Sequence, residues 1–191
     1  ILCNLTMFLL ASSLFGNFGG LLSAIAYGYS PYRASDLYSR GAMGETWAYV
    51  FLPLILYSVI SLYRNPTLKK STFLGLSLAL LLVTHNISSL MFMPMIALIA
   101  LGLITFGKNK TAFLKYGILA IVWSIAMSAT FILPVVFEKG YAHTESLTQG
   151  YFTYLAHFVS LKQLFVSTFW SYGSSDIGPT DDLSFFIGPI H

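Results

Sequence analysis

The chain has 191 residues, of which 56% are hydrophobic and only 9% are charged, and its formal net charge is +3. Soluble domains carry about 25% charged residues, and a soluble chain this poor in charge would expose large apolar patches and aggregate. The composition, with a mean hydropathy of +0.74, therefore argues against a soluble enzyme, a nucleic-acid-binding protein and a disordered tail. It indicates an all-α, polytopic bundle of transmembrane helices.

Five apolar segments are long enough to be predicted as membrane spans. A helix that crosses a bilayer needs about 20 mostly apolar residues. The stretch 71–106 is too long for one span and is interrupted near its middle by Thr84, His85 and Asn86, so we expect two short spans there. The five predicted spans cover residues 1–27, 46–63, 71–84, 88–106 and 111–137.

The rest of the chain is predicted to lie outside these spans. We expect 138–182 to be an extracytoplasmic segment with a helix over 151–169 in the membrane interface, because a narrow polar stripe follows an otherwise aromatic and aliphatic sequence there. Residues 183–191 are predicted to begin a further span. Since the chain starts and stops inside apolar runs, we interpret it as a fragment of one longer membrane domain.

Basic residues predict which way the bundle faces. Two short loops without any acid hold most of the lysines and arginines, namely Arg64, Lys69, Lys70, Lys108, Lys110 and Lys115. Short loops rich in Lys and Arg stay in the cytoplasm. The remaining connections, which carry all seven acids, then face outside. The sequence thus predicts a multi-pass plasma-membrane protein whose chemistry sits at the extracytoplasmic side.

The first external segment carries the main candidate site. Arg33, Asp36 and Arg40 follow one another at spacings of three and four, so one short helix presents them on a single side. Two guanidiniums can hold a phosphate while a carboxylate acts as a base, and Glu45, at the start of the next span, is a candidate for orienting them. Alternatively, Arg40–Glu45 and Arg33–Asp36 are ion pairs that only hold the loop against the helices.

Three other polar residues are weaker candidates. His85 at the apex of the 71–106 hairpin and His157 in the interfacial segment are candidates for orienting a substrate or a base. For His85 we favour the structural alternative, in which the side chain bonds to the free carbonyls at a helix end. Asp181, followed by Asp182, is a second candidate base or a ligand of a divalent cation, although no motif identifies a metal site.

Several motifs together resemble those of a known membrane-protein family. The run from Tyr32 to Glu45, YRASDLYSRGAMGE, resembles the Asp-Leu-Tyr-x-Arg-Gly-Ala-x-x-Glu signature of large prokaryotic membrane proteins described as "6-pyruvoyl-tetrahydropterin synthase-related". Thr84-His85-Asn86 resembles the Ser-His-Asn element of that family, and the stretch 157–185 resembles its later extracytoplasmic motif. By topology, the family is similar to the GT-C type glycosyltransferases.

The resemblance implies a GT-C-like enzyme that transfers a sugar from a polyprenyl-phosphate donor to an acceptor outside the cytoplasm. Its partners would be membrane lipid and that donor, without nucleic acid, and its only candidate cofactor is a divalent cation. A lipid or polymer transporter and a non-catalytic membrane scaffold remain as alternatives. For the enzyme we expect Arg33 and Arg40 to contact phosphate, Asp36 and Asp181 to act as base, and Glu45, His85 and His157 to orient these groups.

Overall fold

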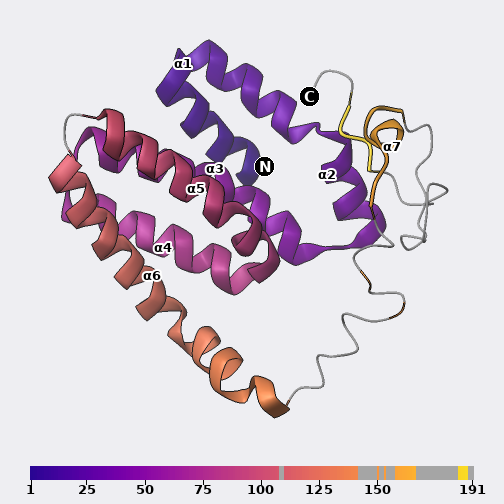
Figure 1. Cartoon of the computed structure of the whole chain (residues 1–191). Coiled ribbons are helices and arrows are strands. Elements are labelled where there is room, and N and C mark those ends of the chain that lie inside the picture. The colour runs from indigo at the N-terminus through magenta and orange to yellow at the C-terminus, as the bar shows by residue number, and fades with distance from the viewer. Residues whose placement is uncertain (108–109, 142–149, 151–152, 154–157, 167–184, 189–191) are drawn as a thin grey trace.

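The computed structural model describes residues 1–107, 110–141, 150, 153, 158–166 and 185–188. Within this part of the chain, 88% of the residues are helical and none lies in a strand. Four of the helices are long and apolar enough to cross a membrane, which confirms the prediction of an all-α membrane bundle (Figure 1).

Five long helices and four short helical segments make up the described chain. In chain order they are α1 (Leu2–Gly28), α2 (Pro31–Ser35), the π-helical turn η1 (Asp36–Arg40), α3 (Met43–Arg64), α4 (Leu68–Thr84), α5 (Asn86–Phe106), α6 (Lys110–Glu138), the 3₁₀ turn η2 (Lys139–Tyr141) and α7 (Leu161–Phe165). The four candidate spans are α1, α3, α5 and α6 with η2. Helix α4 has 17 residues, which is about 25 Å, and it lies between α3 and α6 (Figure 1).

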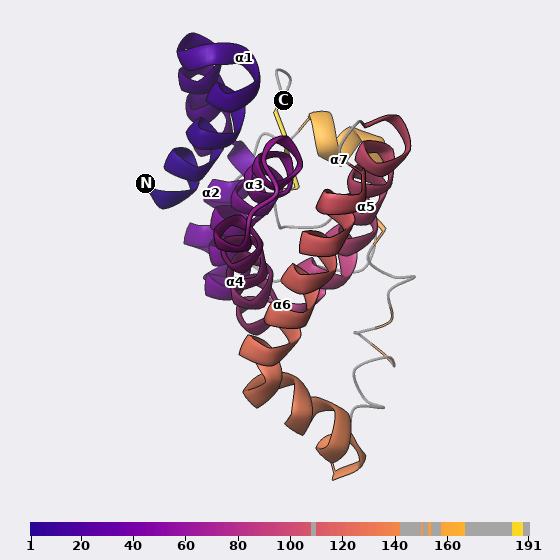
Figure 2. The ribbon, with the colours of Figure 1, turned by 90° about the vertical axis from the view of Figure 1, so that its left-hand side faces the viewer.

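Helix α1 is broken at Gly16 and folds back on itself. Gly16 has φ 77° and ψ 175°, a conformation essentially reserved for glycine. A Cβ at Gly20 would lie 2.7 Å from the Cβ of Ser12, and one at Gly28 would meet the side chain of Asn4. The two arms are therefore antiparallel neighbours, and both views show the reversal (Figures 1 and 2).

This reversal corrects the prediction of one continuous span over 1–27. At about 1.5 Å per residue, the arms 2–15 and 17–28 are about 21 and 18 Å long, and each is shorter than a hydrocarbon core of about 30 Å. The hairpin packs along α3. The hydroxyl of Tyr27 donates to the Tyr49 carbonyl (2.9 Å) near one end of α3, and the guanidinium of Arg64 donates to the Ser13 carbonyl (2.9 Å) at the other.

Small residues allow α4 and α6 to approach closely. The Ser71 hydroxyl of α4 donates to the Tyr116 carbonyl of α6 at 2.7 Å. A Cβ at Gly75 would lie 2.8 Å from the Ala120 carbonyl oxygen. Such small side chains at four-residue intervals are typical of membrane helices in backbone contact. The larger side chains of the surrounding core include Ile55, Leu62, Leu74, Leu81 and Phe113.

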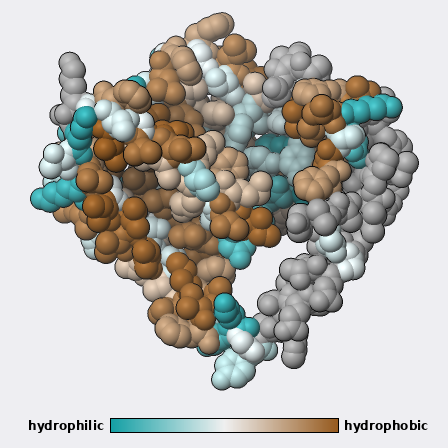
Figure 3. Space-filling model, in the orientation of Figure 1, coloured by the Kyte–Doolittle hydropathy of each residue, from teal (hydrophilic) through white to brown (hydrophobic). Residues whose placement is uncertain are grey.

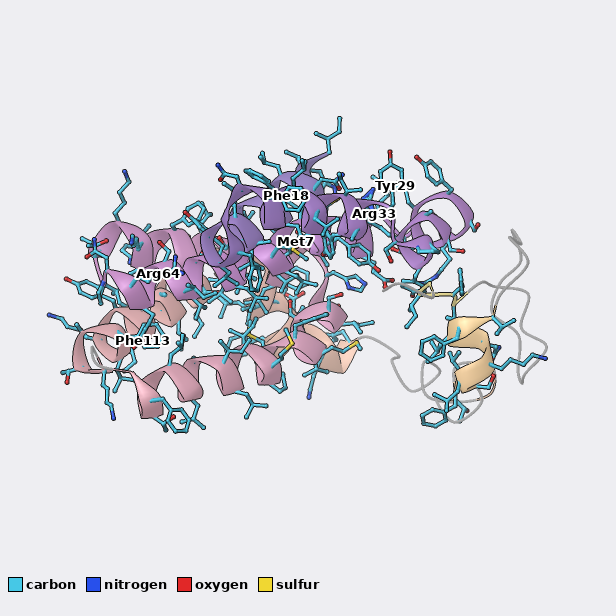
Figure 4. All side chains as sticks on the ribbon, turned by 90° about the horizontal axis from the view of Figure 1, so that it is seen from above. Met7, Phe18, Tyr29, Arg33, Arg64 and Phe113 are labelled. Carbon is cyan, nitrogen blue, oxygen red and sulfur yellow. The ribbon has the colours of Figure 1, made fainter. Side chains whose placement is uncertain are left out.

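The polar segments that connect the long helices lie at two opposite ends of the bundle. At the basic end, the Lys70 ammonium donates to the Ser61 carbonyl (2.9 Å), and Tyr63 contacts Gly107 at the end of α5. At the opposite end, which we call the site end, Gly44 at the start of α3 lies against Thr84 and His85. Figure 4 shows Arg33 with Tyr29 at the site end, far from Arg64 and Phe113.

The predicted interfacial helix over 151–169 is wrong in its described part. Residues 158–160 are not helical, and α7 spans only five residues. The Ser160 hydroxyl accepts from the Gln163 amide (3.3 Å), while Gln163 Oε1 accepts from the Ser160 amide (2.8 Å). This reciprocal pair is a capping box. A capping box marks the first turn of a helix, so the helix begins at Leu161 and does not extend back to residue 151.

The predicted start of a further span over 183–191 is also not helical where it is described, at 185–188. The Ile187 amide donates to the Leu164 carbonyl at 3.0 Å, a bond to another segment in place of the preceding turn of a helix. Gly188 has φ 98°. These residues instead pack against α2, as described below.

Replacing Gly16 by alanine is expected to destabilise the α1 hairpin. Residue 16 must keep a positive φ, and a side chain there costs about 1–3 kcal/mol, although no atom lies within 4 Å of the added Cβ. Gly102→Ala is the matched control, because Gly102 is helical and its Cβ would also meet open space. Thermal unfolding in detergent should show a lower midpoint for Gly16→Ala alone. Equal midpoints for the two variants would contradict the strained turn.

Candidate functional site

The segment 31–40 forms a helical cap at the site end of the bundle. Pro31 occupies the first turn of α2, where its missing N–H costs nothing. The helix continues into η1 and ends at Gly41, which has φ 62°, a left-handed conformation that suits glycine. The prediction that one short helix presents Arg33, Asp36 and Arg40 on a single side holds for Asp36 and Arg40, which form an ion pair, but not for Arg33, which bonds to Cys3.

Arg40 joins two carboxylates, that of Asp36 in this cap and that of Glu45 in the first turn of α3. Its Nη1 lies 2.9 Å from Asp36 Oδ1, 3.0 Å from Glu45 Oε2 and 3.1 Å from the Tyr32 hydroxyl oxygen. The Tyr32 hydroxyl in turn donates to Glu45 Oε1 at 3.4 Å. We call these four residues the carboxyl–arginine cluster. The structure brings together three predicted site residues, and the predicted Arg40–Glu45 pair is among the contacts.

Burial differs sharply among the charged members of the cluster. The side chain of Asp36 is 0% exposed, that of Glu45 is 23% exposed and that of Arg40 is 37% exposed. The second oxygen of Asp36, Oδ2, is buried and has no hydrogen-bond donor within the described chain. One guanidinium thus faces two carboxylates, and one carboxylate oxygen is buried without a donor from the described chain.

The surroundings of Asp36 favour its protonated form. Burial raises the pKa of Asp36 to about 7, the negative charge of Glu45 and a hydrogen bond with it act in the same direction, and Arg40 opposes them. Burial and the carboxylate of Glu45 also raise the pKa of Tyr32 to about 12. At neutral pH, Asp36 is therefore close to the midpoint of its titration.

Arg33 is separate from the cluster. Its Nη1 donates to the sulfur of Cys3 at 2.8 Å, and it forms no ion pair with a carboxylate of the described residues. The predicted Arg33–Asp36 pair is not formed. Arg33 instead lines a cavity of about 640 Å³ at the site end, whose other lining residues are Asn4, Gly28, Tyr29, Ser30, Pro31, Ala34, Leu37, Tyr38 and Phe186.

The short segment 185–188 connects the cavity with the cluster. The ring of Phe185 stacks on that of Tyr32, with centroids 6.5 Å apart and an interplanar angle of 19°. The next residue, Phe186, lines the Arg33 cavity. Figure 3 shows hydrophilic residues in a hollow on this face, within a largely hydrophobic surface.

Sequence reasoning missed Tyr32, Cys3 and the two phenylalanines. Tyr32 lies four residues before Asp36 and eight before Arg40, so its helical spacing was a usable signal. Cys3 reaches Arg33 only because α1 folds back. Phe185 and Phe186 come from a distant part of the chain, and no local pattern indicates their contact.

His85 has a structural position. Its Nδ1 accepts from the Ser88 amide at 3.2 Å and lies 2.7 Å from the Ser88 hydroxyl, so the side chain caps the start of α5. The structural role of His85 agrees with the favoured interpretation, but its partner differs, because the side chain accepts from a backbone amide at the start of α5 instead of bonding to the carbonyls at a helix end.

The predicted metal site stays a prediction. Asp181 and His157 lie outside the described residues. Within the described ranges, no group of three or more His, Cys, Asp and Glu side chains is arranged to hold a metal ion.

Comparisons with known proteins leave the family open. The chain matches no protein-family model, no curated protein and no solved structure at a significant level. The proposal for the function therefore rests on the geometry of the site.

Arg40→Gln is expected to destabilise the cap. Losing the guanidinium leaves Asp36, which is fully buried, without its charged partner, at a cost of about 1–3 kcal/mol. The double variant Arg40→Gln/Asp36→Asn should recover part of this loss, because the uncompensated carboxylate is then absent. Unfolding midpoints in detergent measure both effects, and an Arg40→Gln protein as stable as wild type would show that the cluster contributes little.

Proposed function

We propose that this chain is part of a GT-C-type glycosyltransferase that takes a sugar from a polyprenyl-phosphate donor at the extracytoplasmic face of the membrane. The observation that carries the proposal is the position of Arg33. This arginine, without a carboxylate partner in the described chain, lines a cavity of about 640 Å³ at the site end. Three members of the carboxyl–arginine cluster, Tyr32, Asp36 and Arg40, stand on the same short helical cap, and the fourth, Glu45, begins α3 beside it.

The cavity suits the phosphate of a lipid. A guanidinium offers forked donors that match phosphate oxygens, and the hydroxyl-bearing side chains of Ser30 and Tyr38 also line the cavity. Leu2 and Leu5 on the adjoining arm of α1 are about half exposed, at 50% and 52%. A polyprenyl chain can therefore stay in the bilayer beside α1 while its phosphate reaches Arg33.

Arg40 is less suited to bind a phosphate than Arg33 is, although the sequence suggested both. It is already bonded to Asp36 and Glu45, and a phosphate would have to displace one of them. We therefore assign the phosphate contact to Arg33. Arg40 instead holds the two carboxylates in place.

Glu45 is the carboxylate that an acceptor can reach. Sugar transfer breaks the bond from the anomeric carbon to phosphate, forms a bond to an acceptor oxygen, and releases the proton of the acceptor hydroxyl to a base. Asp36 is fully buried, whereas Glu45 is 23% exposed. We propose that Glu45 receives the proton and that Asp36 sets the charge of the cluster. The sequence had suggested Asp36 as the base and Glu45 as an orienting residue.

The sidedness in this proposal comes from the separation of charges. Arg64, Lys69 and Lys70 meet at the basic end, and the positive-inside rule places such a loop in the cytoplasm. The site end then faces outside.

A non-catalytic scaffold is the second candidate. It is favoured by the closed hydrogen bonding of Arg40, which joins α2, η1 and α3 without any ligand. In that case Arg40 would matter for folding and Arg33 would be dispensable.

Arg33→Gln separates the two candidates. In membranes supplied with polyprenyl-phosphate hexoses, the variant should lose sugar transfer by about 100-fold or more, as expected for the loss of a charged contact to the leaving group. Arg64→Gln, an arginine at the basic end, is the control and should keep full transfer. Both variants should remain folded. Undiminished transfer by Arg33→Gln, or no transfer by folded wild-type protein with any of these donors, would contradict the proposal.

A further inference from the structure

We infer that Asp36 and Glu45 form a proton-binding pair, and that its single proton keeps the 31–40 cap and the 185–188 segment closed over the site end. This inference concerns the conformation of the cap. It does not depend on sugar transfer.

The geometry of the pair calls for one proton. Arg40 Nη1 is shared between Asp36 Oδ1 and Glu45 Oε2, so one positive charge faces two carboxyl groups. With one proton on the pair, the cluster is neutral. Without it, the cluster carries a net negative charge around a fully buried Asp36 side chain, which low-dielectric surroundings disfavour.

The buried oxygen of Asp36 is the place for that proton. Oδ2 has no donor in the described chain, and a carboxylate oxygen buried without a donor is costly. Protonation of Asp36 removes this buried charge, and the negative charge of the neighbouring Glu45 favours the protonated form. Protonation thus removes the repulsion between the two carboxylates that share Arg40.

Within the described chain, no second cation besides Arg40 faces the pair. The other titratable groups that face it are Tyr32 from α2 and Tyr49 from α3. From α1, Tyr27 lies against Tyr49 instead, and its hydroxyl donates to the Tyr49 carbonyl.

Two basic side chains near the cap, Arg33 and His85, are engaged elsewhere. Arg33 bonds to Cys3. His85 lies against Gly44 and uses its Nδ1 for Ser88. Neither of them provides a second positive charge bonded to the two carboxyl groups.

Tyr32 transmits the state of the pair to the cavity. Its hydroxyl is hydrogen-bonded within the cluster, and its ring stacks on the ring of Phe185. Repulsion between two unprotonated carboxylates therefore loosens the ring on which Phe185 stacks. Phe186, the adjoining wall of the Arg33 cavity, then moves away, and the cavity opens.

The direction of the pH dependence follows from the electrostatics. Burial raises the pKa of Asp36 from its ordinary value of 3.8 to about 7, so the folded cap binds a proton that the unfolded chain releases. Stability from this proton is fully present below about pH 4 and is lost as the pH rises through about 7. The cap should be closed in acid and open in mild alkali.

Thiol labelling of the full chain in lipid nanodiscs tests this inference. The reporter is Phe186→Cys in a Cys3→Ser background, which has no other cysteine, and the rate is divided by that of Glu138→Cys in the same background to remove the intrinsic pH dependence of the thiol. From pH 6 to pH 8 the normalised rate should rise by up to about tenfold, because the deprotonated fraction of a group with a pKa of about 7 rises by that factor. With Asp36→Asn the rate should stay low and flat.

Two further variants complete the test. His85→Asn keeps a capping side chain and removes an imidazole, so the rise with pH should persist. If Asp36→Asn does not fold, Glu45→Gln decides, because it also removes one of the two charges and should abolish the rise. A flat rate in the parent protein, or a rise that survives both Asp36→Asn and Glu45→Gln, would overturn the inference.

Discussion

The exclusion of charge from the middle of the apolar helices is the constraint on which the rest of this structure depends. In α3 to α6 the described charged residues lie within the first or last two turns, since an ionised side chain inside a bilayer is costly. The short connections therefore bring the lysines and arginines of the basic end together. The carboxyl–arginine cluster lies at the opposite end, where the described chain brings the Asp36 and Glu45 carboxylates together around Arg40.

Two backbone features turn this segregation into a site. The positive φ of Gly16 sends α1 back along itself, so that Cys3 bonds to Arg33 and Asn4 lines the cavity. The small residues of α4 and α6 hold the bundle beneath the cap through close backbone contact. Neither feature involves a charged group, yet both determine where the charged groups of the cap are placed.

The sequence predicted what depends on hydrophobic length and local spacing. The four helices α3 to α6, the reversal at His85 and the shared face of Asp36 and Arg40 all follow from such patterns. The break at Gly16 had a signal in the glycine-rich stretch 16–20, but apolar length outweighed it. The prediction of a helix over 151–169 was wrong because a polar stripe does not determine where a helix begins. The capping box at Ser160 does determine it. The stacking of Phe185 on Tyr32 is a long-range contact that no local pattern encodes.

Sidedness is the central claim, because the site has no external location unless the two ends of the bundle face opposite sides of the membrane. It is tested most directly with single cysteines at Tyr38 and Lys69, both exposed, in the Cys3→Ser background. A membrane-impermeant maleimide applied to intact cells should label position 38 and should label position 69 only after permeabilisation. Equal labelling of the two positions in intact cells would contradict the account.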